Sequence, residues 1–181
     1  MLSEKIREET KPAHLSLEKL VIQQLKSIRN DEDYAAFLKK FYTYFNQVEK
    51  VIAPYMTKEV LPDYLERRNS SFLKRDIEEL GNNIDDVSVV AVPEITDKVS
   101  ALGALYVMEG SIMGGKIIVQ MLEKLGVTNG LSFFSGYGAE TGKRWAVFTQ
   151  VMNETANTDS LEEKAVHTAN ETFSLFEKVF A

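Results

Sequence analysis

The chain has 181 residues, no cysteine and a formal net charge of −6. One domain is the expectation at this length, and the absence of thiols excludes disulfides, thiolate metal sites and cysteine nucleophiles. The negative charge argues against sequence-independent binding to nucleic acid or to an anionic membrane.

The N-terminal residues MLSEKIREETK are charged and lack the apolar run of a signal peptide. No stretch approaches the roughly 18 consecutive apolar residues that a membrane-spanning helix needs. We therefore expect a cytoplasmic protein with no membrane segment, and the absence of cysteine agrees with a reducing compartment.

Helical periodicity begins at the N-terminus. Residues 3–28 place one apolar stripe at Ile6, Leu15, Leu17, Leu20, Val21 and Leu25. Ser3 is a candidate N-cap. Pro12 interrupts the pattern, so either a new helix begins near Lys11 with Thr10 as its cap, or one helix bends there.

The next segments are helical as well. Residues 30–52 start at a capping Asn30 or Asp31 and carry an aromatic stripe typical of a core. Residues 61–81 predict one or two short helices that end at Gly81. Residues 82–96 have the composition of a strand, but an isolated strand has no partner, so we expect a loop.

The second half of the chain predicts three further helices. The first runs from about Asp97 to Leu125, with Thr96 or Asp97 as its cap and Gly126 as its end. The other two cover residues 139–155 and 160–180. The fold class is therefore all-α, a single helical bundle domain over residues 1–181.

The long helix contains the letters of a phosphate-binding loop, G-x-x-x-x-G-K, from Gly110 to Lys116. Such a loop needs a preceding strand and a Ser or Thr after the lysine to hold Mg²⁺. Here Ile117 follows the lysine, and the preceding residues continue the helical pattern. The motif therefore does not indicate a nucleotide-binding protein.

Two interpretations of these glycines remain. Gly110 and Gly114 share a helix face and would allow a second helix to approach closely, as in small-xxx-small contacts. Alternatively, they expose backbone to a large flat group, with Gly115 widening the smooth strip. Each of the three glycines costs about 1 kcal/mol relative to alanine inside a helix, so a functional reason is expected.

His14 is a candidate metal ligand because of its neighbours. Glu18 lies one turn later on the same face, where a carboxylate would fix the tautomer of a metal-bound imidazole. Arg7 lies two turns earlier on that face, about 10 Å along the helix axis. The other histidine, His167, lacks such neighbours, and we expect it at the surface.

At these residues the chain resembles a known family. REETKPAHLSLE, residues 7–18, is similar to the proximal helix of heme oxygenases, and LGALYVMEGSIMGGKII, residues 102–118, resembles their distal helix. The form Y-V-x-E-G-S-x-x-G-G is most similar to the bacterial heme oxygenases associated with bacteriophytochromes. FFSGYGAETGKRW, residues 133–145, resembles the segment that follows the distal helix in that subgroup.

The resemblance implies a heme oxygenase fold and the cleavage of heme to biliverdin, CO and Fe²⁺ with O₂ and an external electron donor, a ferredoxin or a reductase. Heme would be cofactor and substrate, and the reaction would serve either a bacteriophytochrome that receives the biliverdin or iron acquisition. It also implies that His14 is the axial iron ligand, that Glu18 orients it and that Arg7 pairs with a propionate. The distal helix would lie close over the heme through Gly110, Gly114 and Gly115.

The chain departs from the common family pattern at one position. Many members carry Asp after the first distal glycine, where it organises distal waters, and this chain has Ser111. A hydroxyl can hold a water but is not an anion, so another group, for which Tyr42 is a candidate, is expected to help. For the second propionate, Lys143 and Arg144 are the candidates, with Gln150 as the alternative.

Two other functions compete with this interpretation. A heme-binding or carrier protein without turnover would keep His14 and Arg7, and Ser111 favours that alternative. A di-iron oxidase of similar helical fold would need several Glu and His residues at helical spacing, which two histidines satisfy poorly.

Overall fold

The computed structural model describes all residues from 1 to 181. Seven α-helices and no strand are present, which confirms the all-α prediction. The helices are α1 (Leu2–Glu9), α2 (Lys11–Lys26), α3 (Asp31–Ile52), α4 (Ser70–Glu79), α5 (Lys98–Lys124), α6 (Thr141–Thr155) and α7 (Asp159–Phe180). Three short 3₁₀ turns, η1 (Ala53–Tyr55), η2 (Tyr64–Glu66) and η3 (Gly138–Glu140), lie in the connections.

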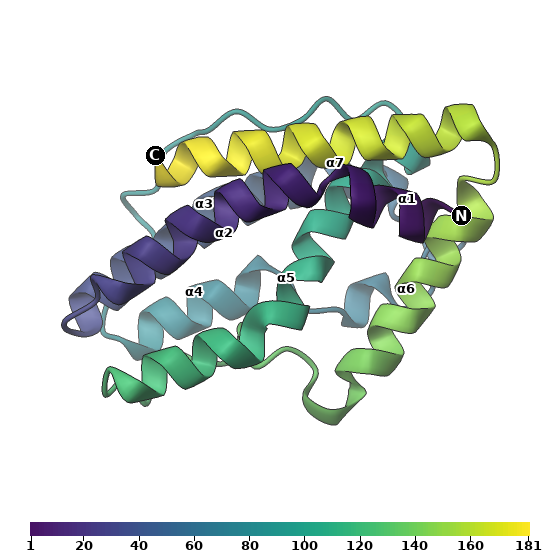
Figure 1. The fold of residues 1–181 in the computed structure, drawn as a ribbon. Coiled ribbons are helices and arrows are strands. Elements are labelled where there is room, and N and C mark those ends of the chain that lie inside the picture. Colours follow the sequence, from purple (N-terminus) through teal and green to yellow (C-terminus); the bar gives the residue numbers. More distant parts are fainter.

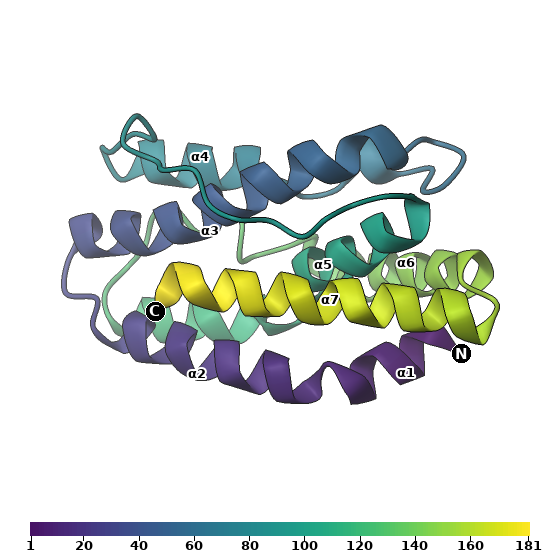
Figure 2. The same ribbon diagram turned by 90° about the horizontal axis from the view of Figure 1, so that it is seen from above.

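The helices form two layers around α7. In Figure 2, α1 and α2 run along one side of α7, and α3 lies on its other side with α4 beyond it. Figure 1 shows α5 descending from the layer of α1, α2 and α7 and then bending, so that its second half runs below α2 and away from α6. The last helix packs against both α5 and α2.

Side chains at the helix starts explain most of the boundaries. The Asn30 side chain accepts a hydrogen bond from the Asp33 N–H, and Asp97 forms a capping box with Ser100. One of the two predicted alternatives is thus confirmed at each helix: Asn30 rather than Asp31, and Asp97 rather than Thr96. The prediction for Ser3 is wrong. The helix already begins at Leu2, and Ser3 instead exchanges hydrogen bonds with the side chain of Asn153 on α6.

The chain changes helix at Pro12, as one of the two sequence alternatives predicted. The α1 helix ends at Glu9 and α2 begins at Lys11. The Thr10 side chain does not cap α2; its hydroxyl donates to the Ile6 carbonyl at 2.6 Å and so ties the junction back to α1. Leu17, which lies beyond the junction, is buried as predicted, whereas Leu15, which was predicted on the same stripe, is 53% exposed.

The core is rich in phenylalanine. Side chains from α3, α7 and the segment between α5 and α6 meet in edge-to-face pairs with ring centroids 5.2 to 6.2 Å apart: Phe37, Phe41, Phe45, Phe133, Phe134, Phe176 and Phe180. The aromatic stripe predicted on the second long helix is therefore mainly core. This packing fixes α3 and α7, against which the more open helices rest.

Residues 82–96 contain no strand, as predicted. Gln47 on α3 explains how this segment is held. Its amide nitrogen donates to the Ser88 carbonyl and its oxygen accepts from the Val90 N–H, each at 3.0 Å. One side chain thus supplies the hydrogen bonds that a neighbouring strand would otherwise provide.

The α5 helix bends near its middle (Figure 1). Gly103, in its first half, lies so close to α7 that an added methyl group would overlap the Ala165 carbonyl. By length and composition alone α5 would suffice to cross a membrane, yet half of its most apolar 18-residue window is buried inside the fold. Its apolar character therefore serves internal packing and the cavity described next.

Candidate functional site

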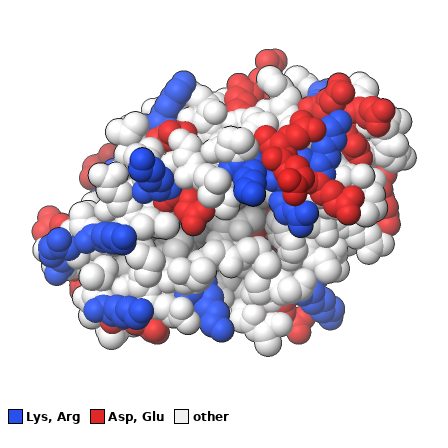
Figure 3. Space-filling view, viewed as in Figure 1, with Lys and Arg blue, Asp and Glu red and all other residues white.

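A cavity of about 530 Å³ opens between α2 and the second half of α5. Sixteen of its 25 lining residues are hydrophobic, and the volume is in the range of small-molecule and cofactor sites. Figure 3, which has the viewpoint of Figure 1, shows a hollow with a mainly uncharged floor, and Lys and Arg side chains lie around its rim together with a few acidic ones. The cavity is thus suited to an apolar ligand with negative groups at its edge.

The imidazole of His14 forms part of the α2 wall. Its side chain is 57% exposed, and its ring lies 5.7 Å from the ring of Phe173 on α7. Glu18 approaches within 3.9 Å, measured from Nε2 to a carboxylate oxygen, which is an ion-pair distance and too long for a hydrogen bond. The imidazole is therefore accessible from the cavity, and whether Glu18 fixes its tautomer stays a prediction.

Two cations lie on the α1–α2 side of the cavity. Arg7, the predicted propionate partner, lines it and is 71% exposed, with only a 3.3 Å contact to Glu8. Lys11 also lines the cavity, and the sequence reasoning did not single it out. Because both side chains are long and reach solvent, they can turn towards an anionic group at the cavity mouth.

The opposite wall is the α5 backbone at Gly110 and Gly114. A methyl group built on Gly114 would meet nothing within 4 Å, and one built on Gly110 would meet only the tip of the Trp145 ring at 3.8 Å. No backbone of a second helix comes within 4 Å of a methyl group at either position, and only the Trp145 side chain of α6 reaches Gly110, so the two glycines do not form a close helix–helix contact. They leave bare backbone facing the cavity.

Gly115 has a different role from its neighbours. It is buried and is not part of the cavity lining. A methyl group on Gly115 would overlap the carbonyl oxygen of Phe134, so the glycine allows the segment after α5 to pass against the helix. The prediction that Gly115 widens the smooth strip therefore does not match its position.

Ser111 lies beside Gly110 and lines the cavity. Its hydroxyl donates to the Met108 carbonyl one turn earlier, at 2.6 Å. Its oxygen also accepts a 2.6 Å hydrogen bond from Nη2 of Arg68, a residue that precedes α4. A hydrogen bond from the buried Arg68 guanidinium therefore holds the Ser111 side chain on the side away from the cavity.

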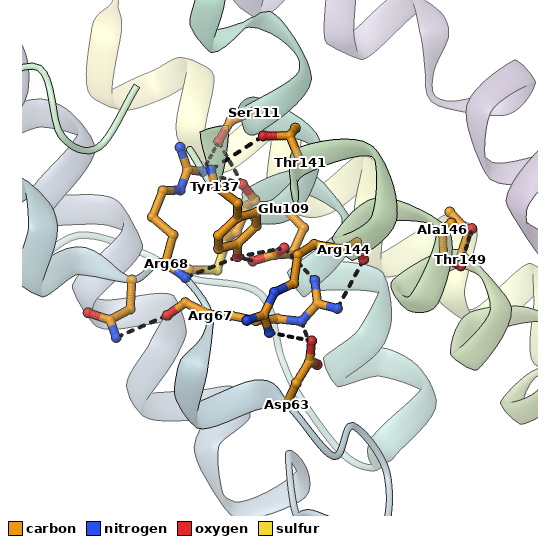
Figure 4. A network of polar contacts seen from close by, with 12 residues as sticks. Asp63, Arg67, Arg68, Glu109, Ser111, Tyr137, Thr141, Arg144, Ala146 and Thr149 are labelled. Carbon is orange, nitrogen blue, oxygen red and sulfur yellow. Dashed lines mark hydrogen bonds and ion pairs between the residues drawn. The ribbon is translucent and has the colours of Figure 1, made fainter. Parts of the chain in front are cut away.

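A buried polar network continues from this point beneath α5 (Figure 4). Arg67 Nη1 donates to Glu109 at 2.8 Å, and both side chains are almost fully buried. The Tyr137 hydroxyl donates to the same carboxylate and accepts from the Arg68 N–H at 3.0 Å. The network joins α5 to the segments that precede α4 and α6.

The outer end of the network reaches the surface at Asp63. Burial alone would raise the pKa of this carboxyl, but hydrogen bonds from Arg67 and Arg144 outweigh burial and lower it. Arg144 also contacts Glu66 at 3.5 Å. The Arg144 guanidinium is thus already paired with two carboxylates, those of Asp63 and Glu66.

Several predicted side chains lie away from the cavity lining. Arg144 is held in the network, and Lys143 points to Glu140 at 3.7 Å with 77% of its side chain exposed. Gln150 donates to Glu154, and Tyr42 is part of the surroundings of the core. None of the four lines the cavity. His167 is exposed, as expected.

Sequence reasoning missed Tyr106, Trp145 and Arg68. The rings of Tyr106 and Trp145 lie 5.8 Å apart and line the cavity near Gly110. Burial raises the pKa of Tyr106, so its phenol stays neutral. Tyr106 stands one helical turn before Gly110 and was detectable from spacing. Arg68 carries no local signal, because it reaches Ser111 across 43 positions of sequence.

The arrangement offers one imidazole and a bare peptide backbone on opposite walls of an apolar cavity. No three His, Asp or Glu side chains are grouped as they would be for a metal ion held by protein alone. The imidazole is therefore suited to a metal that arrives already bound by a flat ligand, which the glycine wall accommodates. The cavity contains few acidic groups that would protonate or deprotonate a substrate.

Comparisons with known proteins agree with this geometry. The family model described as "Heme oxygenase" matches residues 1–181. A protein named heme oxygenase from Xanthomonas campestris pv. campestris is 25% identical over 152 residues, which cover 83% of this chain and 90% of that protein. The NO- and CO-bound heme oxygenase structures from Neisseria meningitidis give a TM-score of 0.81 at 22% identity, covering 99% of this chain and 90% of that chain.

Proposed function

This chain belongs to the heme oxygenase family, and on that premise we propose that the cavity between α2 and α5 is its heme site. Heme is cofactor and substrate in this family. The products we propose are biliverdin, CO and Fe²⁺. The single observation that carries the assignment of the site is the placement of the His14 imidazole and the bare Gly110–Gly114 backbone on opposite walls of one cavity.

The side chains present fit heme. The apolar lining suits a porphyrin, the exposed imidazole suits an axial position on iron, and the cations on the rim suit propionates. When bound, heme supplies both the iron at which O₂ is activated and the porphyrin that is cleaved. In this assignment His14 binds the iron, Glu18 orients the imidazole, and Arg7 with Lys11 pairs with propionate.

The distal wall acts by position. Gly110 and Gly114 let the helix backbone lie against the macrocycle, which leaves little space on that side and excludes bulk water. Ser111 offers a hydroxyl oxygen that can hold one water. The wall has no carboxylic acid facing the cavity, so proton supply depends on such ordered water.

The chain's partners and context extend this proposal. A ferredoxin or a reductase supplies the electrons in the cytoplasm, and residues 1–181 act as one heme oxygenase-like domain. The form of residues 106–115, with Ser111 in place of the common Asp, supports membership of the bacteriophytochrome-associated subgroup. Biliverdin made here would then pass to a bacteriophytochrome.

The alternative is a heme carrier of the same fold without turnover. Ser111 favours it, because the distal wall lacks the carboxylate that organises water in many members of the family. A carrier would show the same histidine-ligated complex, so spectra of the resting complex do not separate the two functions. Only turnover does.

The test is an aerobic reaction of the purified protein with one equivalent of hemin, ascorbate and catalase, followed by absorbance. An enzyme loses its Soret band while a broad red biliverdin band grows, and chromatography of the product gives the regiochemistry. A persistent Soret band, also with a competent ferredoxin system, would instead identify a carrier. A protein that forms no complex with hemin would refute the site itself.

A further inference from the structure

Arg68 is a buried cation without a carboxylate partner. The residue is buried, with 6% of its surface exposed, and its guanidinium lies 3.7 Å from the centre of the Phe133 ring. The three hydrogen bonds of its side chain all go to neutral oxygens: the Phe133 carbonyl at 2.8 Å, the Met108 carbonyl at 3.0 Å and Ser111 Oγ at 2.6 Å. Its Nε has no partner at all.

The neighbouring acidic groups do not neutralise this charge by contact. Glu109 is bound to Arg67 and Tyr137, and Glu49 accepts from the backbone and hydroxyl of Ser70. Both carboxylates act on Arg68 only at longer range. Burial lowers the pKa of Arg68 to about 10, so the guanidinium is still protonated at neutral pH.

If Arg68 served only to connect two carbonyls and a hydroxyl, a neutral side chain with hydrogen-bond donors would be sufficient. An unpaired buried cation is costly, and its retention calls for an anion that is not part of the resting protein. The direction in which such an anion would lie is given by Ser111, because this residue connects Arg68 to the cavity lining.

The bond to Arg68 also sets the polarity of Ser111. The hydroxyl hydrogen is already donated to the Met108 carbonyl, and one lone pair accepts from Arg68. Only the remaining lone pair is free, so towards the cavity Ser111 acts as an acceptor. A water held there is therefore oriented with a hydrogen towards Ser111 and its oxygen lone pairs elsewhere.

We propose that Arg68 is a positioning residue of the distal wall, which fixes Ser111 as a hydrogen-bond acceptor and stabilises negative charge on the α5 side of bound heme. The positive charge lies in the protein interior, where the effective dielectric constant is lower and its effect is larger than at the surface. This inference rests on the proposed heme site. Ser111 carries no charge, so in this proposal Arg68 supplies the positive charge that stabilises an anion beside the distal wall.

The experiment compares an anionic with a neutral ligand on the ferric heme complex. Azide and imidazole are titrated optically against hemin-reconstituted wild type, Arg68→Met, Arg68→Gln, Arg68→Lys and Ser111→Ala. Arg75→Met is the matched control, since Arg75 also lies over a phenylalanine ring, that of Phe72, but outside the cavity lining. Circular dichroism checks the fold of each variant. If Arg68→Met does not fold, Arg68→Gln is the neutral variant for the comparison, because its amide can still donate to the carbonyls.

The expected result is a five- to tenfold weaker azide affinity, roughly, in Arg68→Met and Arg68→Gln, with imidazole affinity within about twofold of wild type. Arg68→Lys restores azide binding, and Arg75→Met keeps it within about threefold, because Arg68 is unchanged in that variant. Ser111→Ala lowers azide affinity less than the neutral Arg68 variants do, because it removes the acceptor but retains the buried charge of Arg68. Unchanged azide binding in the neutral Arg68 variants would overturn the proposal. So would a parallel loss of azide and imidazole, which indicates a structural role. If wild type bound no hemin, the heme site itself would be refuted instead.

Discussion

The two walls of the cavity are built in opposite ways. On the α2 wall and the adjoining α1, His14, Glu18 and Arg7 are about half exposed or more, and their polar contacts within the protein are few and long. On α5, Ser111 and Glu109 are backed by a buried network of arginines and Tyr137 (Figure 4). The α2 wall is completed by its ligand, whereas the α5 wall is formed before any ligand binds.

This difference separates affinity from stability. Changes on the α2 wall should alter heme binding with little effect on the folded protein, because exposed side chains contribute little to unfolding free energy. Changes in the buried network behind the α5 wall should lower the stability of the folded protein more than they alter heme binding. Each variant below tests one side of this comparison.

The largest effect on ligand binding is expected for His14→Ala. The substitution removes the only imidazole on the cavity and should abolish the axial-histidine spectrum of the hemin complex. The melting temperature of the protein without hemin should stay within about 1–2 °C of wild type, since the histidine is more than half exposed. His167→Ala is the matched control, and an unchanged spectrum in His14→Ala would refute the ligand assignment.

The largest effect on stability is expected for Arg67→Met. It leaves the Glu109 carboxylate buried without its cation and should destabilise the protein by about 3–5 kcal/mol in urea unfolding. Lys143→Met, an exposed cation of the same region, should change stability by less than about 0.5 kcal/mol. Equal stability of the two variants would show that the network does not hold the α5 wall.

Two neighbouring glycines give a sharper comparison. In Gly115→Ala the new methyl group collides with the Phe134 carbonyl, so the protein should lose about 1–3 kcal/mol of stability. In Gly114→Ala the methyl group meets nothing, and helix propensity predicts a gain of up to about 1 kcal/mol. Gly114→Ala should instead weaken hemin binding or turnover, and the opposite pattern would exchange the roles of the two residues.

A smaller effect is expected at the start of α5. Asp97→Ala removes a capping box and the ion pair with Lys164 and should cost about 1 kcal/mol at pH 7. Burial alone would raise the pKa of Asp97, but hydrogen bonds from Lys164 and Ser100 lower it. The carboxylate therefore stabilises the fold above about pH 4, and most of the difference between the variant and wild type should vanish as the pH falls below that value.

The smallest effect is expected for Arg7→Gln. An exposed cation at the rim contributes about 0.2–1 kcal/mol, so the hemin dissociation constant should rise roughly two- to fivefold. Lys143→Gln is the control, because Lys143 lies outside the cavity lining. If Lys143→Gln weakened hemin binding more than Arg7→Gln, the prediction that Lys143 pairs with the second propionate would be supported instead.

The parts that sequence reasoning predicted correctly are local. The helix spacing of Gly110 and Gly114, the caps at Asn30 and Asp97, and the loop around Pro93 follow from neighbours within a few residues. The parts that it missed depend on long-range contact. Arg68 meets Ser111, and Gly115 meets Phe134, only because segments before α4 and after α5 fold onto the same helix.

The central claim is that heme lies between His14 and the bare backbone of Gly110 and Gly114. A crystal structure of the hemin complex tests it most directly. The account predicts iron bound to the His14 imidazole, the macrocycle against the two glycines, and propionates near Arg7 and Lys11. Density for hemin outside this cavity, or iron ligated by another residue, would contradict it.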